Sequence, residues 1–194
     1  MKVVAISSSP RRDGNTAILL SHVLAELDAA GIETELVQLA GKSLSGCTGC
    51  LKCATALDNH CHGVKDDGVN ECIDKMLAAD GILLGTPVFF GDANATMRAL
   101  IERTGYATRK NGNPLARKVG AAVIAVRRGG AMHAFDSVNH FFLISQMIVP
   151  GSCYWNVGIG REKGDVLKDE EGLRTMRVLG ENMAWLLAKV CTEG

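Results

Sequence analysis

The 194-residue sequence has no excess of charge of either sign and no long apolar run. Its 21 basic and 21 acidic residues cancel, so no electrostatic signal points to nucleic acid or to an anionic membrane surface. No apolar run approaches the ~18 residues that a membrane-spanning helix needs. Only about five apolar residues follow Lys2, too few for the core of a signal peptide. We therefore expect a cytoplasmic protein that binds neither nucleic acid nor a membrane.

Several functional motifs are absent as well. No Gly-Lys-Ser or Gly-Lys-Thr follows the glycine of the first loop, and no G-x-G-x-x-G occurs, so neither a P-loop nor a dinucleotide fingerprint is present. No Ser/His/acid set and no pair of carboxylates stands out, so we predict no catalytic side chain. No repeat, low-complexity tract or linker divides the chain. We predict a single domain over residues 1–194, with a cysteine-rich loop at about 43–65.

Short apolar runs alternate with helical patterns along the chain. The predicted strands are residues 3–6, 35–39, 81–85, 119–126 and 152–157. The predicted helices run from Thr16 to Gly31, from Asp66 or Asp67 past Met76, from Asn94 to Gly105, from about Ala131 to Met147, and from Met176 to Val190, with a charged loop at 160–171 before the last. Strands separated by helices predict an α/β fold with a parallel sheet. With right-handed crossovers, this favours a three-layer α/β/α flavodoxin-like fold whose five-stranded sheet has the order 2-1-3-4-5.

The first strand leads through a hydroxyl-rich, basic turn into a helix. The N–H groups of a first helical turn and the positive end of the helix dipole favour a phosphate. Ser9 and Thr16 add hydroxyl donors, and Arg11 or Arg12 can add a guanidinium fork. These residue types indicate a terminal phosphate monoester such as that of FMN. An ordinary loop with a helix N-cap at Asn15 or Thr16 would give the same pattern.

Ligands of such a sheet lie beyond the carboxyl ends of the strands, near the switch in strand order. Three loops there differ from ordinary ones, namely Ser7–Thr16, Thr86–Gly91 and Arg127–Gly130. In the second loop, Pro87 and two adjacent phenylalanines can form an apolar wall for an isoalloxazine ring. In the third, two glycines let the backbone approach a planar ring. Each loop alone also fits core packing or a simple turn, but together they predict a flavin.

These segments resemble, in order along nearly the whole chain, the NADPH-dependent FMN reductase and iron–sulfur flavoprotein family. The similar stretches are SSPRRDGNT at 8–16, CTGCLKC at 47–53, KDD at 65–67, ADGILLGTPVFFG at 79–91 and RALIER at 98–103. Phe89 stands where a tyrosine is more usual, and Met97-Arg98 where leucine and lysine are more usual. The resemblance implies non-covalently bound FMN. It also implies a homodimer or homotetramer with flavin sites at subunit contacts.

The same resemblance assigns FMN contacts to the three loops. At the phosphate it places Ser9, Arg11, Asn15 and Thr16, with Gly14 in the same loop. Along the ring it places Pro87, Val88, Phe89, Phe90, Gly91, Gly129 and Gly130. We take these residues as the predicted cofactor site.

Four of the seven cysteines follow the spacing C-x2-C-x2-C-x7-C, at Cys47, Cys50, Cys53 and Cys61. In a reducing compartment such cysteines indicate metal ligands, redox groups or buried side chains rather than disulfides. The first three match the compact run that wraps one corner of a [4Fe–4S] cluster. The fourth, after a variable gap, matches the pattern of the iron–sulfur flavoproteins that the sequence resembles.

Three alternatives to a cluster remain open from the residues alone. Zinc could recruit His60 or His62 beside the cysteines. Cys50 and Cys53 could form a redox dithiol, with Lys52 lowering a thiol pKa. The loop could also bind nothing. Another cysteine, Cys72, falls on the apolar face of its helix and is expected in the core.

We predict an FMN-binding oxidoreductase. Electrons would pass through FMN either from NAD(P)H to a quinone- or flavin-type acceptor or to and from a [4Fe–4S] cluster. The alternative is a pure electron-transfer iron–sulfur flavoprotein served by a ferredoxin-like protein. In the NAD(P)H case the basic stretch Arg103, Arg109 and Lys110 could meet the nucleotide phosphates, although a solvated surface explains it equally well. Trp155 is expected in the core rather than on a flavin.

Overall fold

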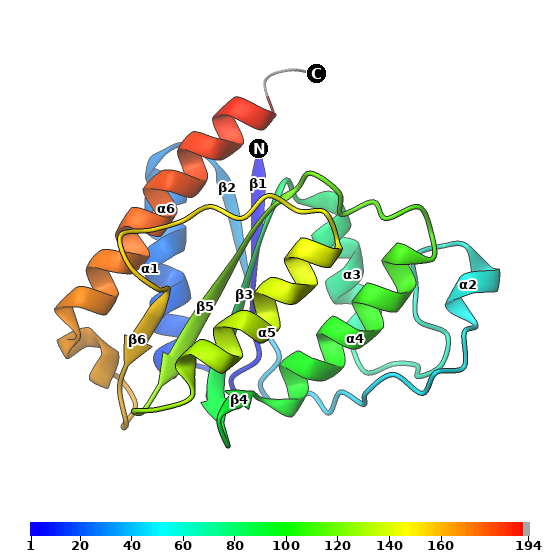
Figure 1. Ribbon diagram of the computed structural model, residues 1–194, viewed down its shortest axis with the longest axis horizontal. Coiled ribbons are helices and arrows are strands. Elements are labelled where there is room, and N and C mark those ends of the chain that lie inside the picture. Colours follow the sequence, from blue (N-terminus) through cyan, green and yellow to red (C-terminus); the bar gives the residue numbers. More distant parts are fainter. Residues whose placement is uncertain (192–194) are drawn as a thin grey trace.

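A computed structural model describes residues 1–191 and shows one sheet covered by helices on both faces (Figure 1). The strands are β1 (Lys2–Ser7), β2 (Glu33–Gln38), β3 (Gly81–Phe89), β4 (Asp92–Ala93), β5 (Val119–Val126) and β6 (Val157–Ile159). The helices are α1 (Asn15–Ala29), α2 (Cys53–Ala56), α3 (Val69–Ala78), α4 (Ala95–Arg109), α5 (Ala131–Ile144), the short 3-10 helix η1 (Asp165–Lys168) and α6 (Glu170–Val190). None of the helices in this part of the chain is long and apolar enough to cross a membrane.

The sheet has the strand order β2-β1-β3-β5-β6, and neighbours in this order are parallel. β4 lies off this path and pairs with the end of β3 in antiparallel fashion. Counted without β4, the order is the predicted 2-1-3-4-5, and the switch in strand order lies between β1 and β3. The predicted three-layer flavodoxin-like fold is confirmed.

β1 illustrates why the sheet is buried on both faces. Val4 and Ile6 point into a core shared with α3, α4 and α5, whereas Val3 and Ala5 point into a core shared with α1 and α6. Side chains of a strand alternate between its two faces, so one continuous apolar run serves both cores. Figure 1 shows α1 and α6 on one side of the sheet and α3, α4 and α5 on the other.

The fourth α-helix starts where the sequence predicts but ends later. The Asn94 side chain accepts a hydrogen bond from Met97 N (3.1 Å), which confirms the predicted N-cap. The helix then continues through Gly105 to Arg109, so the predicted end at Gly105 is wrong. A glycine inside a helix costs about 1 kcal/mol relative to alanine. The turn after it buries Ala107 in the core, which offsets that cost.

The region from 152 to 170 also differs from the prediction. The predicted strand 152–157 is wrong except at its last residue, because Ser152 Oγ donates to Asn156 Oδ1 (2.6 Å) and holds a turn there. Only Val157–Ile159 pairs with β5. α6 begins inside the predicted charged loop, where Asp169 Oδ1 accepts from Gly172 N (3.0 Å) and caps the helix.

Two predictions about buried side chains have opposite outcomes. Cys72 lies in the core as expected, and burial raises the pKa of its thiol to about 11. Trp155 does not lie in the core, because its side chain is half exposed. It packs at the surface beside Phe135 and Tyr154, with ring centroids 6.4 and 5.7 Å away.

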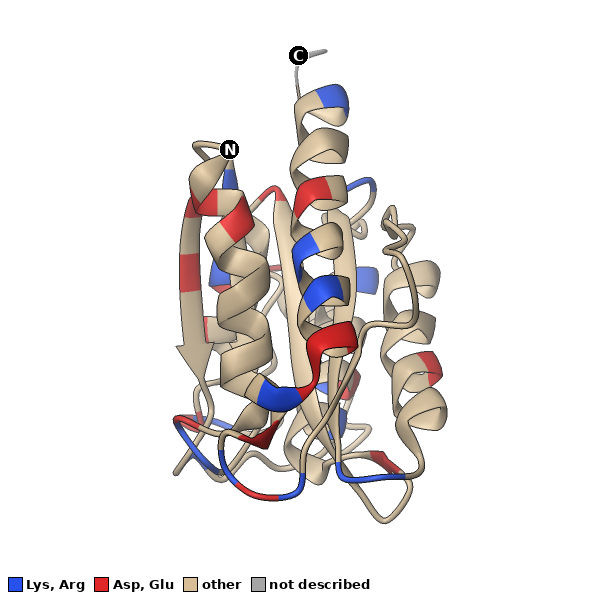
Figure 2. Ribbon diagram, turned by 90° about the vertical axis from the view of Figure 1, so that its left-hand side faces the viewer, with Lys and Arg blue, Asp and Glu red and all other residues tan. Residues whose placement is uncertain are grey.

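Charged residues of both signs are interspersed on the surface formed by α1 and α6. Figure 2 shows Lys and Arg mixed with Asp and Glu along α6 and in the loops below it. This distribution agrees with the balance of 21 basic and 21 acidic residues. This view therefore gives no large field of one sign that would attract a polyanion.

Candidate cofactor cavity and cysteine site

The three loops predicted to bind a flavin meet at one edge of the sheet, where β1, β3 and β5 end. A cavity of about 180 Å³ lies there, and we call it the edge cavity. Its lining residues come from these loops, from the end of β5 and from the turn after β6, and they are Ser9, Pro10, Arg11, Asn15, Thr16, Pro87, Val88, Phe89, Ala125, Arg127, Gly160 and Arg161. Loops far apart in the sequence thus enclose one site, as the strand order requires.

The β1–α1 loop leaves the start of α1 free for a ligand. The N-cap residue is Gly14, which supplies no side-chain hydrogen bond, and the first turn of α1 carries no acidic residue. Neither Asn15 nor Thr16 therefore acts as the cap that the ordinary-loop interpretation requires. The loop is closed internally, because Ser9 Oγ accepts from Arg11 N (3.2 Å). Orphan N–H groups at a helix start favour an anion.

The predicted phosphate residues differ in how they face the edge cavity. Ser9, Arg11 and Thr16 line it, whereas Gly14 supports the loop from outside the lining. Asn15 also lines it, but its side chain is committed elsewhere. Its Nδ2 donates to Gly160 O (3.2 Å) and Glu162 O (2.9 Å), and its Oδ1 accepts from Gly164 N (2.8 Å). Asn15 therefore faces the cavity mainly through its backbone.

The second and third loops touch each other beside the cavity. A Cβ on Gly130 would lie 2.7 Å from Gly91 Cα, so only glycine allows this approach. Gly130 also has a φ of +86°, which side chains rarely adopt. The predicted ring residues Phe90, Gly91, Gly129 and Gly130 thus flank the edge cavity without lining it. Phe90 is fully exposed at the tip of the second loop.

A buried asparagine that the sequence suggested only as a helix cap joins the loops. Asn94 Nδ2 donates to Ser8 O (2.7 Å), and Asn94 N donates to Thr86 Oγ1 (3.2 Å). The same residue caps α4 through its Oδ1. It therefore fixes the first loop, the second loop and a helix relative to one another. The sequence carried the cap signal but no signal for the contacts with Ser8.

Three arginines from three loops line the edge cavity, and no carboxylate does. Only Arg11 belongs to the predicted site. Arg127 directly follows β5, so its position at the end of a strand could have predicted it as a residue of the cavity lining. Arg161 comes from the turn after β6, where no local pattern marked it. This charge distribution favours an anionic ligand.

All four predicted metal ligands lie around a second, smaller pocket. Cys47, Cys50, Cys53 and Cys61 line it together with His62, Gly63 and Arg103. A Cβ on Gly63 would lie 2.8 Å from Cys50 Sγ and 4.0 Å from Cys61 Sγ, so a side chain at this position would intrude on the thiols. The pocket itself is only about 20 Å³, so the donor set, four thiols converging on one point, is what fits a [4Fe–4S] cluster.

The thiol pKa values in this pocket are not uniform. The backbone N–H of Lys52 and the hydroxyl of Thr48 lower the pKa of Cys50 below its ordinary value. Burial raises the pKa of Cys53. Burial also opposes ionisation of Cys61, but hydrogen bonds from Val64 N and from the Arg103 guanidinium outweigh it and bring the pKa of Cys61 below its ordinary value.

Arg103 is fully buried beneath the cysteine loop. Its Nε donates to Cys61 Sγ (3.2 Å), its guanidinium donates to Ser45 O (3.4 Å) and Val64 O (3.0 Å), and it forms an ion pair with Asp67. The predicted surface role of Arg103 is therefore wrong. The Arg103 guanidinium is buried and bound to groups of the cysteine loop, so it cannot contact a nucleotide phosphate.

The rest of the basic stretch also lies away from the edge cavity. Arg109 and Lys110 are at the carboxyl end of α4, whereas Asn94 at the other end contacts the cavity loops. Fifteen helical residues span roughly 22 Å at about 1.5 Å per residue. These two side chains instead line a groove of about 610 Å³ between α4 and α5.

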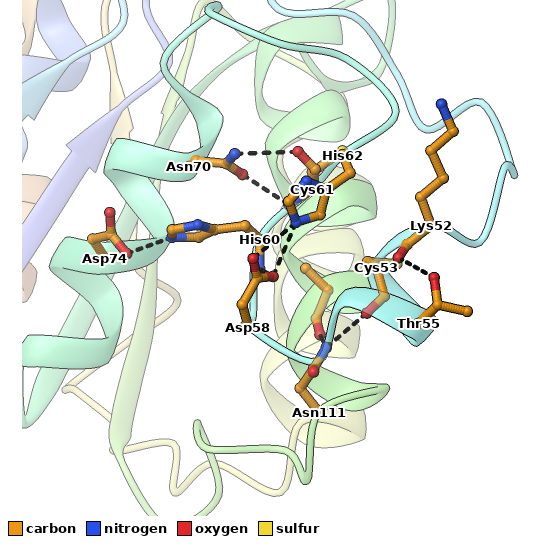
Figure 3. A network of polar contacts seen from close by, with 11 residues as sticks. Lys52, Cys53, Thr55, Asp58, His60, Cys61, His62, Asn70, Asp74 and Asn111 are labelled. Atoms are coloured by element: carbon orange, nitrogen blue, oxygen red, sulfur yellow. Dashed lines mark hydrogen bonds and ion pairs between the residues drawn. The ribbon is translucent and has the colours of Figure 1, made fainter.

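Figure 3 shows how the cysteine loop is held by hydrogen bonds to α3 and to the turn after α4. Asn70 pairs with the backbone of Cys61 in both directions, at 2.8 and 3.1 Å. Asn111 Nδ2 donates to Cys53 O (3.1 Å). These contacts fix the backbones of two of the four cysteines relative to α3 and to the turn after α4.

Both histidines of the loop are engaged by carboxylates rather than by the thiols. His60 Nε2 lies 2.7 Å from Asp74 Oδ1, and His62 Nε2 lies 2.9 Å from Asp58 Oδ2 (Figure 3). Across residues 1–191, no three His, Cys, Asp or Glu side chains stand close enough to hold a single metal ion. Ligands of a cluster stand farther apart because each thiolate binds a different iron. The two histidines that the zinc alternative would recruit are thus hydrogen-bonded to Asp74 and Asp58 in this structure.

The parallel α/β/α sheet, with an uncapped helix start at its carboxyl edge, defines a protein of the flavodoxin-like fold class. A model of the family described as NADPH-dependent FMN reductase matches residues 1–162. An iron–sulfur flavoprotein of Methanocaldococcus jannaschii is 40% identical over 191 residues, covering 95% of this chain and 96% of the relative. One of Methanosarcina thermophila is 35% identical over 153 residues, covering 78% of each chain. The chain belongs to the NADPH-dependent FMN reductase family.

Solved structures support the fold independently. RosB with a bound flavin-derived intermediate superposes with a TM-score of 0.77 at 16% identity, covering 100% of this chain and 81% of that one. An archaeal flavodoxin gives a TM-score of 0.62 at 14% identity, covering 97% and 99%. The predicted family, fold and flavin-dependent oxidoreductase class are confirmed.

Proposed function

We propose that this protein carries electrons between FMN in the edge cavity and a [4Fe–4S] cluster on the cysteine loop. One observation carries the flavin part: the edge cavity joins the uncapped start of α1 to three arginines and contains no carboxylate in its lining. The cluster part is supported by the convergence of four thiols. It is also supported by relatives named iron–sulfur flavoproteins, one of them 40% identical.

For FMN, the chain's own residues supply an anion site and an apolar wall. The free N–H groups at the start of α1, the hydroxyls of Ser9 and Thr16, and the Arg11 guanidinium would hold the phosphate. Asn15 contributes its backbone N–H. Pro87 and Phe89 give an apolar surface for the ring. FMN, when bound, supplies the two-electron redox chemistry.

For the cluster, the chain supplies thiolates and hydrogen bonds to them. The predicted ligands are Cys47, Cys50, Cys53 and Cys61. Arg103 Nε already donates to Cys61 Sγ, an interaction of the kind that sets the potential of iron–sulfur sites. A [4Fe–4S] cluster, when bound, supplies one-electron chemistry at this face.

For the external partner, the first candidate is a ferredoxin-like protein that exchanges electrons at the cysteine loop, where Cys50 is exposed. Arg109 and Lys110 lie at the end of α4 far from the edge cavity, so the nucleotide contact predicted for them does not apply. A second candidate is direct reduction by NAD(P)H with a quinone- or flavin-type acceptor, which the description of the matching family favours.

We also propose a homodimer or homotetramer that completes the flavin site. The edge cavity, at about 180 Å³, is smaller than the ~300–1,000 Å³ of typical ligand pockets. Phe89 is half exposed and Phe90 fully exposed beside it. The α4–α5 groove adds exposed apolar side chains, including Ile144. A second copy covering Phe89 and Phe90 would close the site, and the mass in solution, from light scattering, tests this.

Purification without oxygen tests both cofactors at once. We expect flavin absorption bands, a broad cluster absorption beneath them, and bound iron. Cys50→Ala should lose nearly all iron and keep its flavin, because Cys50 lines the cysteine pocket and not the edge cavity. Cys191→Ala is the matched control, since this exposed cysteine lies at the end of α6. It should keep both.

The outcomes separate the two parts of the proposal. Wild-type iron content in Cys50→Ala would show that the ligand set is wrong. A protein that takes up no flavin from excess FMN would contradict the flavin part whatever its iron content.

A further inference from the structure

The turn after β6 brings Arg161 to the edge cavity from the far end of the sequence. Arg161 lines the cavity beside Arg11 and Arg127. Its side chain is 66% exposed, and its Nε lies 3.1 Å from Glu162 Oε1, the nearest carboxylate in sequence. An exposed pair of this kind is weak. The guanidinium can therefore turn to a ligand anion at little cost.

Hydrogen bonds from Asn15 hold the turn after β6 beside the edge cavity. The Asn15 side chain makes three hydrogen bonds to Gly160, Glu162 and Gly164, the residues on both sides of Arg161. A Cβ on Gly160 would lie 2.8 Å from Asn15 Nδ2, so the glycine makes this close contact possible. The Asn15 side chain, which the family resemblance assigns to the phosphate, is thus fully engaged as a latch on this turn.

A second contact ties the same two segments together. Lys163 Nζ lies 3.3 Å from Asp13 Oδ2, which joins the turn to the loop before α1. Gly160 N also donates to Val126 O (2.9 Å), so the turn starts from a fixed position on the sheet. The segment 160–164 is therefore held against the β1–α1 loop and the end of β5.

We propose that Arg161 is a specificity residue for the phosphate of the flavin and that Asn15 is its positioning residue. This inference rests on the proposed function. A guanidinium binds a phosphate dianion through charge-assisted hydrogen bonds, whereas the terminal hydroxyl of riboflavin offers it only a neutral partner. Arg161 thus selects FMN over riboflavin. The effect should weaken with salt, because the site is open to solvent.

Equilibrium binding of FMN and of riboflavin, followed by flavin fluorescence, tests this. Arg161→Gln should weaken FMN binding about tenfold and change riboflavin binding by less than about twofold. Arg177→Gln removes one positive charge from the exposed surface of α6 and should leave both affinities unchanged. Equal FMN affinity in Arg161→Gln and wild type would overturn the inference.

Asn15→Ala tests the latch, since it keeps the backbone N–H and removes the three side-chain contacts. We expect the same selective loss for FMN and faster hydrogen exchange in segment 160–164. Added to Arg161→Gln, Asn15→Ala should cost little more, because both act through one guanidinium. Full additivity would overturn the positioning role.

The result for wild type separates this inference from the function on which it rests. Wild type that binds FMN no better than riboflavin contradicts both the phosphate site and the inference. Wild type that prefers FMN, with an Arg161→Gln variant that keeps the full preference, contradicts the inference alone.

Discussion

Asp67→Asn should lower the free energy of unfolding by about 3–5 kcal/mol, because it leaves the Arg103 charge buried without a counter-ion. Arg103 is 1% exposed, and Asp67 is its ion-pair partner. The same change should reduce iron retention. Arg103 also holds Cys61 Sγ and the backbone of Ser45 and Val64, so the loop that carries the ligands loosens with it. Urea denaturation and iron analysis measure the two effects.

The neighbouring carboxylate gives a matched control. Asp66 is exposed and has a φ of +58°, a conformation that asparagine adopts readily, so Asp66→Asn should be nearly neutral. If Asp67→Asn unfolds within about 1 kcal/mol of wild type, the buried ion pair does not have the role described here.

Low pH should weaken the Asp67–Arg103 ion pair and thereby lower the free energy of unfolding. Burial raises the pKa of Asp67, but the Arg103 guanidinium outweighs it, so the pKa lies below its ordinary value. The pair therefore contributes its full stability above the ordinary aspartate pKa of about 3.9. This contribution is lost as the pH falls toward the lower pKa of the folded state, and Asp67→Asn should remove this part of the acid dependence.

The second large effect is expected at the contact between the two loops beside the edge cavity. Gly130→Ala would place a Cβ 2.7 Å from Gly91 Cα, at a φ of +86°. Backbone strain and overpacking together should cost about 2–4 kcal/mol. Since both loops flank the proposed flavin site, FMN affinity should fall as well. Thermal unfolding and FMN titration measure these changes.

Gly129→Ala is the matched control for this prediction. A Cβ on Gly129 would meet no atom within 4 Å, so this variant should retain the stability of wild type. Equal loss of stability in Gly129→Ala and Gly130→Ala would contradict the proposed loop contact.

The sheet could be predicted from sequence because its signals are local. The apolar run Val3–Ile6, the buried strand Val119–Val126 and the cap at Asn94 each lie within a few residues, and all three appear in the structure. The strand order then follows from handedness and short connections. The end of α4 could not be predicted in this way, because tertiary packing of the helix outweighs the weak helix propensity of Gly105.

The lining of the edge cavity could be predicted only in part, because its other residues depend on contacts between positions far apart in the sequence. Arg103 looks like one cation in a basic surface stretch, and only the folded loop shows that it is buried against Asp67. Arg161 reaches the cavity through three hydrogen bonds from Asn15. No periodicity or spacing connects two such positions. Ser9, Thr16 and Phe89 were found because strand ends meet at one edge of the sheet.

A crystal structure of the protein grown with excess FMN tests the central claim most directly. The account predicts FMN in the edge cavity, with its phosphate against the start of α1, within hydrogen-bond distance of Ser9 and Thr16, and its ring toward Phe89. An edge cavity filled by protein side chains, or FMN bound instead in the α4–α5 groove, would contradict the account.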